Sequence, residues 1–233
     1  MSRTITIIET GLVPAELRDE HGSYPDMFER MLSASKPAEV ETISVCKGDS
    51  LPDPDGVEAA LITGSAHGVY EDHDWIAPLE TFIRSLHRRG VPLVGVCFGH
   101  QLIAQAMGGV VRKSEKGWGI GRHVYAVNPD VTLIDRVALG ITCSHQDQVV
   151  VPPPGATAWL SSGFTPHAGL IYDTGRVLTV QAHPEFTEDY ARTRCEARRG
   201  HAPDDVVETG LASLSLPLDN AELGRLVTRF LEA

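Results

Sequence analysis

Short apolar runs alternate with helical patterns along most of the chain. Two short apolar runs, residues 5–8 and 93–96, predict strands buried on both faces, as in a parallel sheet. Residues 40–45 and 59–62 predict two further strands. Between them, apolar residues at helical spacing predict a helix after Ser23 and another over residues 75–89. Ser23 and Asp74 are the expected caps of these helices, and the polar segment 9–24 is expected to be a loop.

In the second half of the chain, the sequence predicts short strands, a hairpin turn and two helices. Strands are expected at 158–161, 169–172 and 176–180, with a hairpin turn at 173–175. A helix is expected over residues 187–199, carrying a solvated cluster of arginines that includes Arg198, and a last helix is expected to run from its cap Asn220 to Glu232. The order of elements predicts one α/β domain over residues 1–233, with a doubly wound, mostly parallel sheet between helices and an antiparallel extension.

The segment Gly95-Val-Cys97-Phe-Gly99 joins a predicted strand to a helical pattern that ends at Gly108-Gly109. Small residues two places before and after a nucleophile allow a sharp strand-to-helix turn that exposes the middle side chain. Here that side chain is the Cys97 thiol, and the positive end of the helix dipole favours its thiolate. A buried, inert cysteine is the alternative, so the interpretation requires a base elsewhere in the chain.

Two histidines are candidates for that base. His183 follows the strand at 176–180 and is accompanied by Glu185, whose carboxylate can hold the imidazole in one tautomer. His145 lies in the segment Ser144-His-Gln-Asp147 and competes with His183 on sequence grounds alone. The carboxylate partner favours His183 as the base.

Together, Gly-Val-Cys97-Phe-Gly-His-Gln101 and Gln-Ala-His183-Pro-Glu185-Phe resemble the two signatures of class I (triad-type) glutamine amidotransferase domains, such as the glutaminase domain of GMP synthase. The resemblance extends over residues 5–186, and the chain after residue 187 carries no family motif. It implies a flavodoxin-like fold and hydrolysis of the L-glutamine side-chain amide through a Cys-His-Glu triad and a γ-glutamyl thioester. The ammonia would pass to a separate synthase subunit.

The same resemblance implies the rest of the site. Backbone N–H groups of Gly64 or Ser65 and of Phe98 would form an oxyanion hole, although Thr63 stands where relatives have a second glycine. The segment Ser144-His145-Gln146 fits a family segment that binds the α-amino and α-carboxylate groups of the substrate. The implied substrate-binding residues are Gln101, Gly117, Trp118, Ser144, His145 and Gln146.

Composition narrows the possible partners. A net charge of −11 argues against nucleic acid or an anionic membrane as the main partner. The four cysteines are scattered without a C-x-x-C pair, which predicts reduced thiols in a cytoplasmic protein and no zinc motif. No signal peptide or membrane-spanning run is expected, and the expected chemistry requires no metal or other cofactor.

Two other functions stay open. Some compact relatives cleave γ-glutamyl peptide bonds, which needs the same triad and a wider pocket for the leaving group. A non-catalytic binding or regulatory protein is the remaining class, and the intact Cys97, His183 and Glu185 argue against it. The sequence does not identify the γ-glutamyl substrate, the ammonia acceptor or the oligomeric state.

Overall fold

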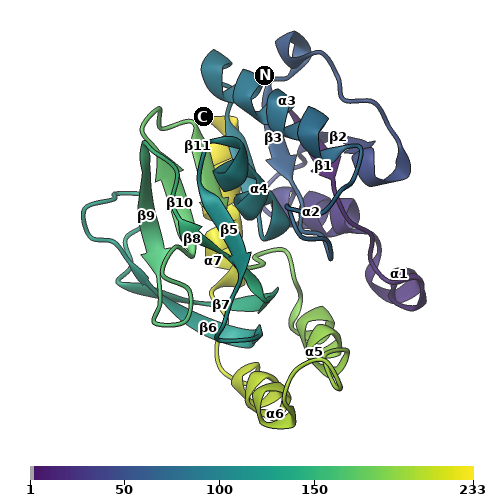
Figure 1. The fold of residues 1–233 in the computed structure, drawn as a ribbon, viewed down its shortest axis with the longest axis vertical. Helices are drawn as coiled ribbons and strands as arrows, with labels where there is room; N and C mark the ends of the chain where they lie inside the picture. The colour runs from purple at the N-terminus through teal and green to yellow at the C-terminus, as the bar shows by residue number, and fades with distance from the viewer. Residues whose placement is uncertain (1–2) are drawn as a thin grey trace.

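A nine-stranded sheet forms the centre of the protein, seen in a computed structural model that describes residues 3–233 (Figure 1). Its first three strands in sequence are β1 (Thr4–Glu9), β2 (Glu39–Ser44) and β3 (Ala59–Ile62). The later strands are β4 (Leu93–Val96), β6 (Gly119–Val127), β7 (Ala138–His145), β9 (Ala156–Ser161), β10 (Gly169–Tyr172) and β11 (Val177–Val180). A separate two-stranded sheet pairs β5 (Val110–Lys113) with β8 (Asp147–Val151).

The strand order is β2-β1-β3-β4-β11-β10-β9-β6-β7. The strands from β2 to β11 run parallel to their neighbours, and those from β10 to β7 form an antiparallel extension. The predicted fold class is therefore confirmed, including the extension built from the second half of the chain.

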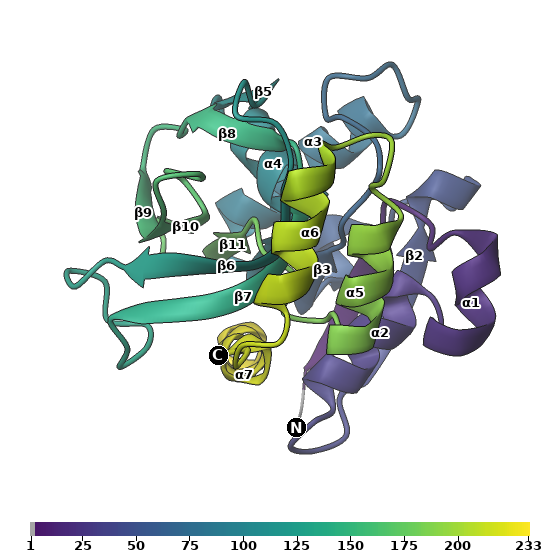
Figure 2. The ribbon, with the colours of Figure 1, turned by 90° about the horizontal axis from the view of Figure 1, so that it is seen from below.

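Helices cover both faces of the parallel part of the sheet. One face carries α2 (Tyr24–Leu32) and α7 (Asn220–Glu232), and the other carries α3 (Ile76–Arg89) and α4 (Phe98–Ala106) (Figure 2). The remaining helices are α1 (Ala15–His21), α5 (Glu188–Glu196) and α6 (Asp204–Ser213). No helix within residues 3–233 is both long and apolar enough to cross a membrane.

The central strands β3 and β4 are apolar throughout, and β1 is buried along nearly its whole length, because alternate side chains enter two different cores. In β1, Ile5 and Ile7 pack with the apolar faces of α2 and α7, whereas Ile8 packs with α3 and α4. In β3, Leu61 and Ile62 divide in the same way. Both faces of these strands are thus removed from water, as the continuous apolar runs predict.

Three local predictions are wrong. The segment expected to be a loop contains α1, whose Leu17 packs on an apolar cluster with α5, a long-range contact that a polar local sequence does not indicate. Helix α3 begins after Trp75 without a side-chain cap, so Asp74 does not cap it; the Ile76 N–H instead donates to the His73 carbonyl. Asn220 is the first residue of α7 rather than its cap.

The cap predicted at Ser23 is confirmed. Its hydroxyl accepts a hydrogen bond from the Asp26 N–H at 3.2 Å, and the Asp26 carboxylate accepts one from the Ser23 N–H at 2.7 Å. This reciprocal pair satisfies two N–H groups at the start of α2. The start of α2 is thereby stabilised by its own local sequence.

Candidate active site

The Cys97 turn has the sharp geometry that its sequence predicts. Cys97 lies between β4 and α4 with φ 53° and ψ −104°, and within residues 3–233 it is the one non-glycine residue with a positive φ. A Cβ atom added to Gly99 would collide with the Ile62 carbonyl oxygen, and one added to Gly95 would lie 2.5 Å from the Gly99 oxygen. Glycine at both positions therefore lets α4 approach the strands closely. Strain held at an ordinary residue is typical of functional sites.

His183 and Glu185 reach the same edge of the sheet because β4 and β11 are parallel neighbours. Val96 pairs with Val180, so the residues that follow both strands emerge side by side. The His183 Nδ1 atom lies 2.7 Å from Glu185 Oε1, and both side chains are buried. The His183 ring also stacks on Phe186, with centroids 4.0 Å apart and planes 9° apart. The ring is thus held at one edge by a carboxylate and on one face by an aromatic ring.

The charges around His183 favour an imidazolium. Burial alone would lower the pKa of His183, but the Glu185 carboxylate and Cys97 together raise that pKa to about 10. The second carboxylate oxygen of Glu185 is buried and has no hydrogen-bond partner within residues 3–233, so the imidazolium is the main group that compensates its charge. With Nδ1 facing Glu185, Nε2 is the ring nitrogen left for Cys97.

His145, the competing base, has a different environment. Burial, reinforced by His123, lowers the pKa of His145 to about 3, so this ring is neutral. Its Nδ1 atom lies 3.1 Å from the Asp147 carbonyl oxygen, to which it donates. A neutral imidazole bound to a backbone carbonyl lacks the carboxylate that accompanies His183. The geometry therefore favours His183 over His145 as the base.

The predicted oxyanion-hole residues surround the Cys97–His183 pair. A Cβ atom on Gly64 would lie 3.0 Å from His183 Cε1 and 3.6 Å from Cys97 Cβ, so the backbone after β3 passes directly against the pair. Phe98 is the first residue of α4, and its N–H has no acceptor within the helix. Ser65 lines the same pocket as Cys97. These backbone groups are thus close enough to be candidate donors to a ligand at Cys97.

A polar pocket of about 180 Å³ opens over Cys97. Gln101 lines it, but the Gln101 side-chain N–H groups donate to the Asp147 carbonyl at 2.8 Å and to Gln181 Oε1 at 3.0 Å, which leaves its carbonyl oxygen for a ligand. Gly117 is not among the lining residues and lies in a turn with φ 79°. The other predicted binding residues that line the pocket are Trp118, Ser144, His145 and Gln146.

Arg198 lines the pocket, although its local sequence does not indicate this. Its guanidinium lies 3.9 Å from the centre of the Trp118 ring, and its Nη2 atom lies 3.4 Å from Ser144 Oγ. Its Nε atom is buried without a hydrogen-bond partner in the described part of the chain. Burial, together with Arg194, lowers the pKa of Arg198 to about 10, which leaves it charged at neutral pH. The prediction of a solvated face for Arg198 is wrong because residues 187–199 do not form one helix: α5 ends at Glu196.

These features are those of an α/β protein with a cysteine at a strand-to-helix elbow. The family model "Glutamine amidotransferase class-I" matches residues 29–199, and the chain belongs to this family. The predicted family is thereby confirmed.

Curated relatives of different kinds resemble this chain. A glutamine amidotransferase-like protein of Schizosaccharomyces pombe is 28% identical, over 99% of both chains. Gamma-glutamyl peptidase 4 of Arabidopsis thaliana is 30% identical, over 83% of this chain and 81% of the peptidase. The glutamine-hydrolysing GMP synthase of Burkholderia vietnamiensis is 31% identical, over 56% of this chain and 25% of the synthase.

The fold has close counterparts among solved structures. A glutamine amidotransferase from Thermotoga maritima superposes with a TM-score of 0.74 at 20% identity, covering 100% of both chains. One from Methylobacillus flagellatus superposes with a TM-score of 0.73 at 19% identity, covering 99% of this chain and 93% of that one. At these identities the likeness concerns the fold alone.

Proposed function

We propose that this protein hydrolyses the side-chain amide of L-glutamine, with Cys97 as nucleophile, His183 as general acid and base, and Glu185 as the group that orients His183. The observation that carries the proposal is the buried 2.7 Å contact between His183 and Glu185 beside the strained Cys97 turn. Nucleophile, base and orienting carboxylate are the three groups that acyl transfer to a thiol requires.

In the first half of the reaction, the Cys97 thiolate attacks the amide carbon and a C–S bond forms. Charge develops on the amide oxygen, where N–H groups of Phe98 and of Gly64 or Ser65 stabilise it. The His183 imidazolium then donates its Nε2 proton to the amide nitrogen. The C–N bond breaks, ammonia leaves, and a γ-glutamyl thioester remains on Cys97.

In the second half, the now neutral His183 takes a proton from water as the oxygen attacks the thioester carbon. The C–S bond breaks, glutamate leaves, and the thiolate–imidazolium pair is restored. Glu185 retains its charge throughout and holds Nδ1–H, so the same Nε2 atom serves both steps. No step requires a group beyond these side chains, the backbone and water.

The released ammonia would serve a separate acceptor protein. One relative is named as a glutamine-hydrolysing GMP synthase, and this chain matches only 25% of its length. L-glutamine and such a synthase are the substrate and partner that we propose.

Arg198 supports a second candidate, the hydrolysis of γ-glutamyl peptides. Its charged side chain lines the pocket beside Trp118, yet its Nε–H has no acceptor within residues 3–233. A buried guanidinium without a paired anion favours a carboxylate-bearing ligand. A γ-glutamyl peptide carries one carboxylate more than the glutamyl group itself, and a relative is named as a γ-glutamyl peptidase.

Glutamate release from L-glutamine and from glutathione by the purified protein tests both candidates, with Cys97→Ala as the matched control. Cys97-dependent release from glutamine, increased by an acceptor synthase, is the result expected for the amidotransferase. Cys97-dependent release mainly from glutathione would instead support the hydrolysis of γ-glutamyl peptides. If no thioester on Cys97 can be trapped with either substrate, both candidate functions are contradicted.

A further inference from the structure

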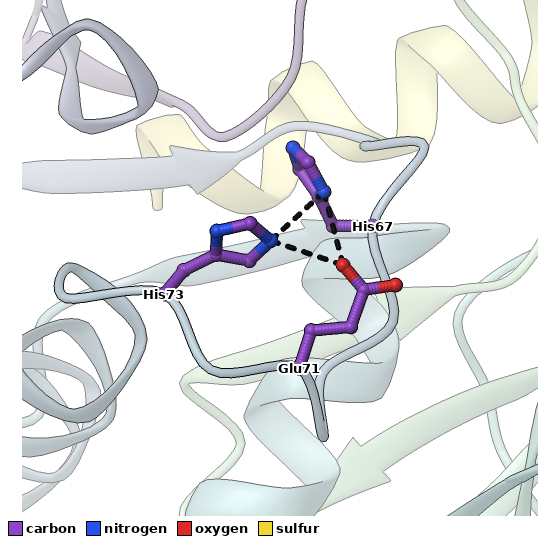
Figure 3. Close-up of side chains that lie close together, drawn as sticks. All are labelled: His67, Glu71 and His73. Atoms are coloured by element: carbon purple, nitrogen blue, oxygen red, sulfur yellow. Dashed lines mark hydrogen bonds and ion pairs between the residues drawn. The ribbon is translucent and has the colours of Figure 1, made fainter.

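Three side chains of the loop between β3 and α3 converge on one point. His67 Nδ1 lies 3.1 Å from Glu71 Oε2, His73 Nε2 lies 3.0 Å from the same oxygen, and the two histidine nitrogens are 2.9 Å apart (Figure 3). Figure 3 shows the two rings and the carboxylate directed toward each other from three positions along the loop. The three atoms thus form a nearly equilateral triangle.

Protons alone do not satisfy this triangle. If both nitrogens carry a proton, both can donate to Glu71, but the two N–H groups then face each other at 2.9 Å. If only one carries a proton, it can donate to the other nitrogen, but the lone pair of the bare nitrogen then faces the Glu71 carboxylate oxygen. With Glu71 as a carboxylate, each assignment therefore leaves at least one of the three contacts between two donors or between two lone pairs.

A metal ion satisfies all three contacts, because each ligand atom then directs a lone pair at the cation. With metal–ligand bonds of about 2.0–2.1 Å, neighbouring ligand atoms lie about 2.9–3.4 Å apart in octahedral or tetrahedral geometry. The observed separations of 2.9, 3.0 and 3.1 Å match the octahedral end of that range. Two imidazoles and one carboxylate are donors that suit first-row transition metals rather than magnesium or calcium.

We propose that His67, Glu71 and His73 bind a divalent transition-metal ion of the zinc class. The three protein ligands leave coordination positions open for water or for a ligand in the pocket. The site lies within one short loop, so the loop conformation shown here already brings all the ligands together.

Neighbouring groups orient two of the ligands. The Gly68 N–H donates to Glu71 Oε1 at 2.9 Å, which leaves Oε2 for the ion. The His73 ring stacks on Trp75, with centroids 5.6 Å apart and planes 12° apart. Trp75 in turn packs on Phe98, the residue after Cys97, at 5.7 Å. Such outer contacts are what hold metal ligands in fixed orientations.

The proposed ion would lie at the wall of the pocket that Cys97 opens into, because His67 and Glu71 line that pocket. Its open positions can accept an anionic group of a molecule bound there, such as a carboxylate. The binding of the ion itself is independent of the proposed reaction, since none of its ligands belongs to the Cys97, His183 and Glu185 group.

The test is titration of tag-free, chelator-treated protein with Zn²⁺ by calorimetry, and with Co²⁺ by absorption spectroscopy. We expect one equivalent to bind, with a cobalt spectrum that lacks a thiolate charge-transfer band. His73→Gln and Glu71→Gln should each weaken binding at least tenfold. His201→Gln, at an exposed histidine outside the cluster, and Cys97→Ala should leave the affinity unchanged.

Three results would overturn the proposal. They are no saturable Zn²⁺ binding by the wild-type protein, loss of binding in Cys97→Ala, and unchanged affinity in both cluster variants. Because the cluster side chains are partly exposed, the variants should retain the wild-type melting temperature, and this measurement separates ligand loss from misfolding. Mg²⁺ is the negative control, as a cation that prefers oxygen ligands.

Discussion

The side-chain amide of Asn220 donates a hydrogen bond to the backbone carbonyl of His183 at 3.1 Å, across 37 residues of chain. The same nitrogen donates to the Phe186 carbonyl at 2.9 Å, and Asn220 Oδ1 accepts from the Thr142 N–H at 3.2 Å. The first residue of α7 therefore fixes the loop that carries His183. Asn220 is a positioning residue, since it acts on the site through that loop.

Asn220→Ala should destabilise the protein, because it leaves the Phe186 carbonyl and the Thr142 N–H buried without their partner. A loss of about 1–3 kcal/mol of unfolding free energy is expected for such groups. Asn220→Asp should be at least as damaging, since a carboxylate would face two carbonyl oxygens. Urea unfolding measures both variants, and wild-type stability in Asn220→Ala would show that these bonds contribute nothing.

The pKa of His183 predicts how stability varies with pH. Its folded-state pKa of about 10 lies above the unfolded value of about 6.5, so the folded state holds the proton more tightly. This stabilisation is fully present below pH about 6.5 and is lost as pH rises through the folded pKa. Over that window it lowers the unfolding free energy by at most about 1.4 kcal/mol per pH unit.

The measurement is urea unfolding of wild type and His183→Asn at a series of pH values between those limits. The difference in unfolding free energy between them should shrink as the pH rises, because only the wild type loses the stabilisation that comes from the proton on His183. Glu185→Gln should shift the alkaline limb of activity to lower pH, since it removes the carboxylate that raises the His183 pKa. A stability difference between wild type and His183→Asn that does not vary with pH would contradict the assignment of His183 as an imidazolium.

Gly99→Ala should destabilise the strand-to-helix turn, because the new Cβ would collide with the Ile62 backbone carbonyl, which cannot move independently of β3. A loss of about 1–3 kcal/mol is typical of overpacking in a tight core. Gly163→Ala is the matched control, since a Cβ there meets nothing within 4 Å. Equal melting temperatures for the two variants would mean that the turn tolerates a side chain.

Arg198→Gln should weaken the binding of γ-glutamyl peptides more than that of L-glutamine. Loss of one charge-assisted hydrogen bond of about 1.5–3 kcal/mol corresponds to a KM increase of about tenfold or more. Arg192→Gln is the control, because Arg192 pairs with Glu188 on the surface of α5. Steady-state kinetics with both substrates measure the effect, and an equal loss on both would assign Arg198 to the glutamyl group instead.

Local sequence was sufficient for the elbow and for the pairing of His183 with Glu185. Gly95, Cys97 and Gly99 encode a turn whose geometry depends on residue size within five positions, and Glu185 lies two residues from His183. The strands β3 and β4 were equally predictable from the sequence, because burial on both faces requires continuous apolar runs.

The missed features depend on contacts between distant segments. Arg198 enters the pocket only because the chain turns after α5 and meets Trp118 and Ser144 of the antiparallel extension. The local sequence predicts a helix cap at Asn220, since no local pattern shows that its side chain points toward the sheet. The local sequence predicts only that His67 lies in a loop, because its contact with His73 depends on how that loop folds.

The placement of β11 beside β4 has a consequence for folding. The Cys97 turn follows a strand that is synthesised early, whereas His183 follows β11, which is synthesised after the strands of the antiparallel extension and pairs with β4. Pairing between segments so distant in sequence is slow, since the loop-closure entropy is lost before the contacts form. A nascent chain would therefore carry the Cys97 thiol without His183 and Glu185 beside it until β11 pairs with β4, so the complete proposed site should form late in biosynthesis.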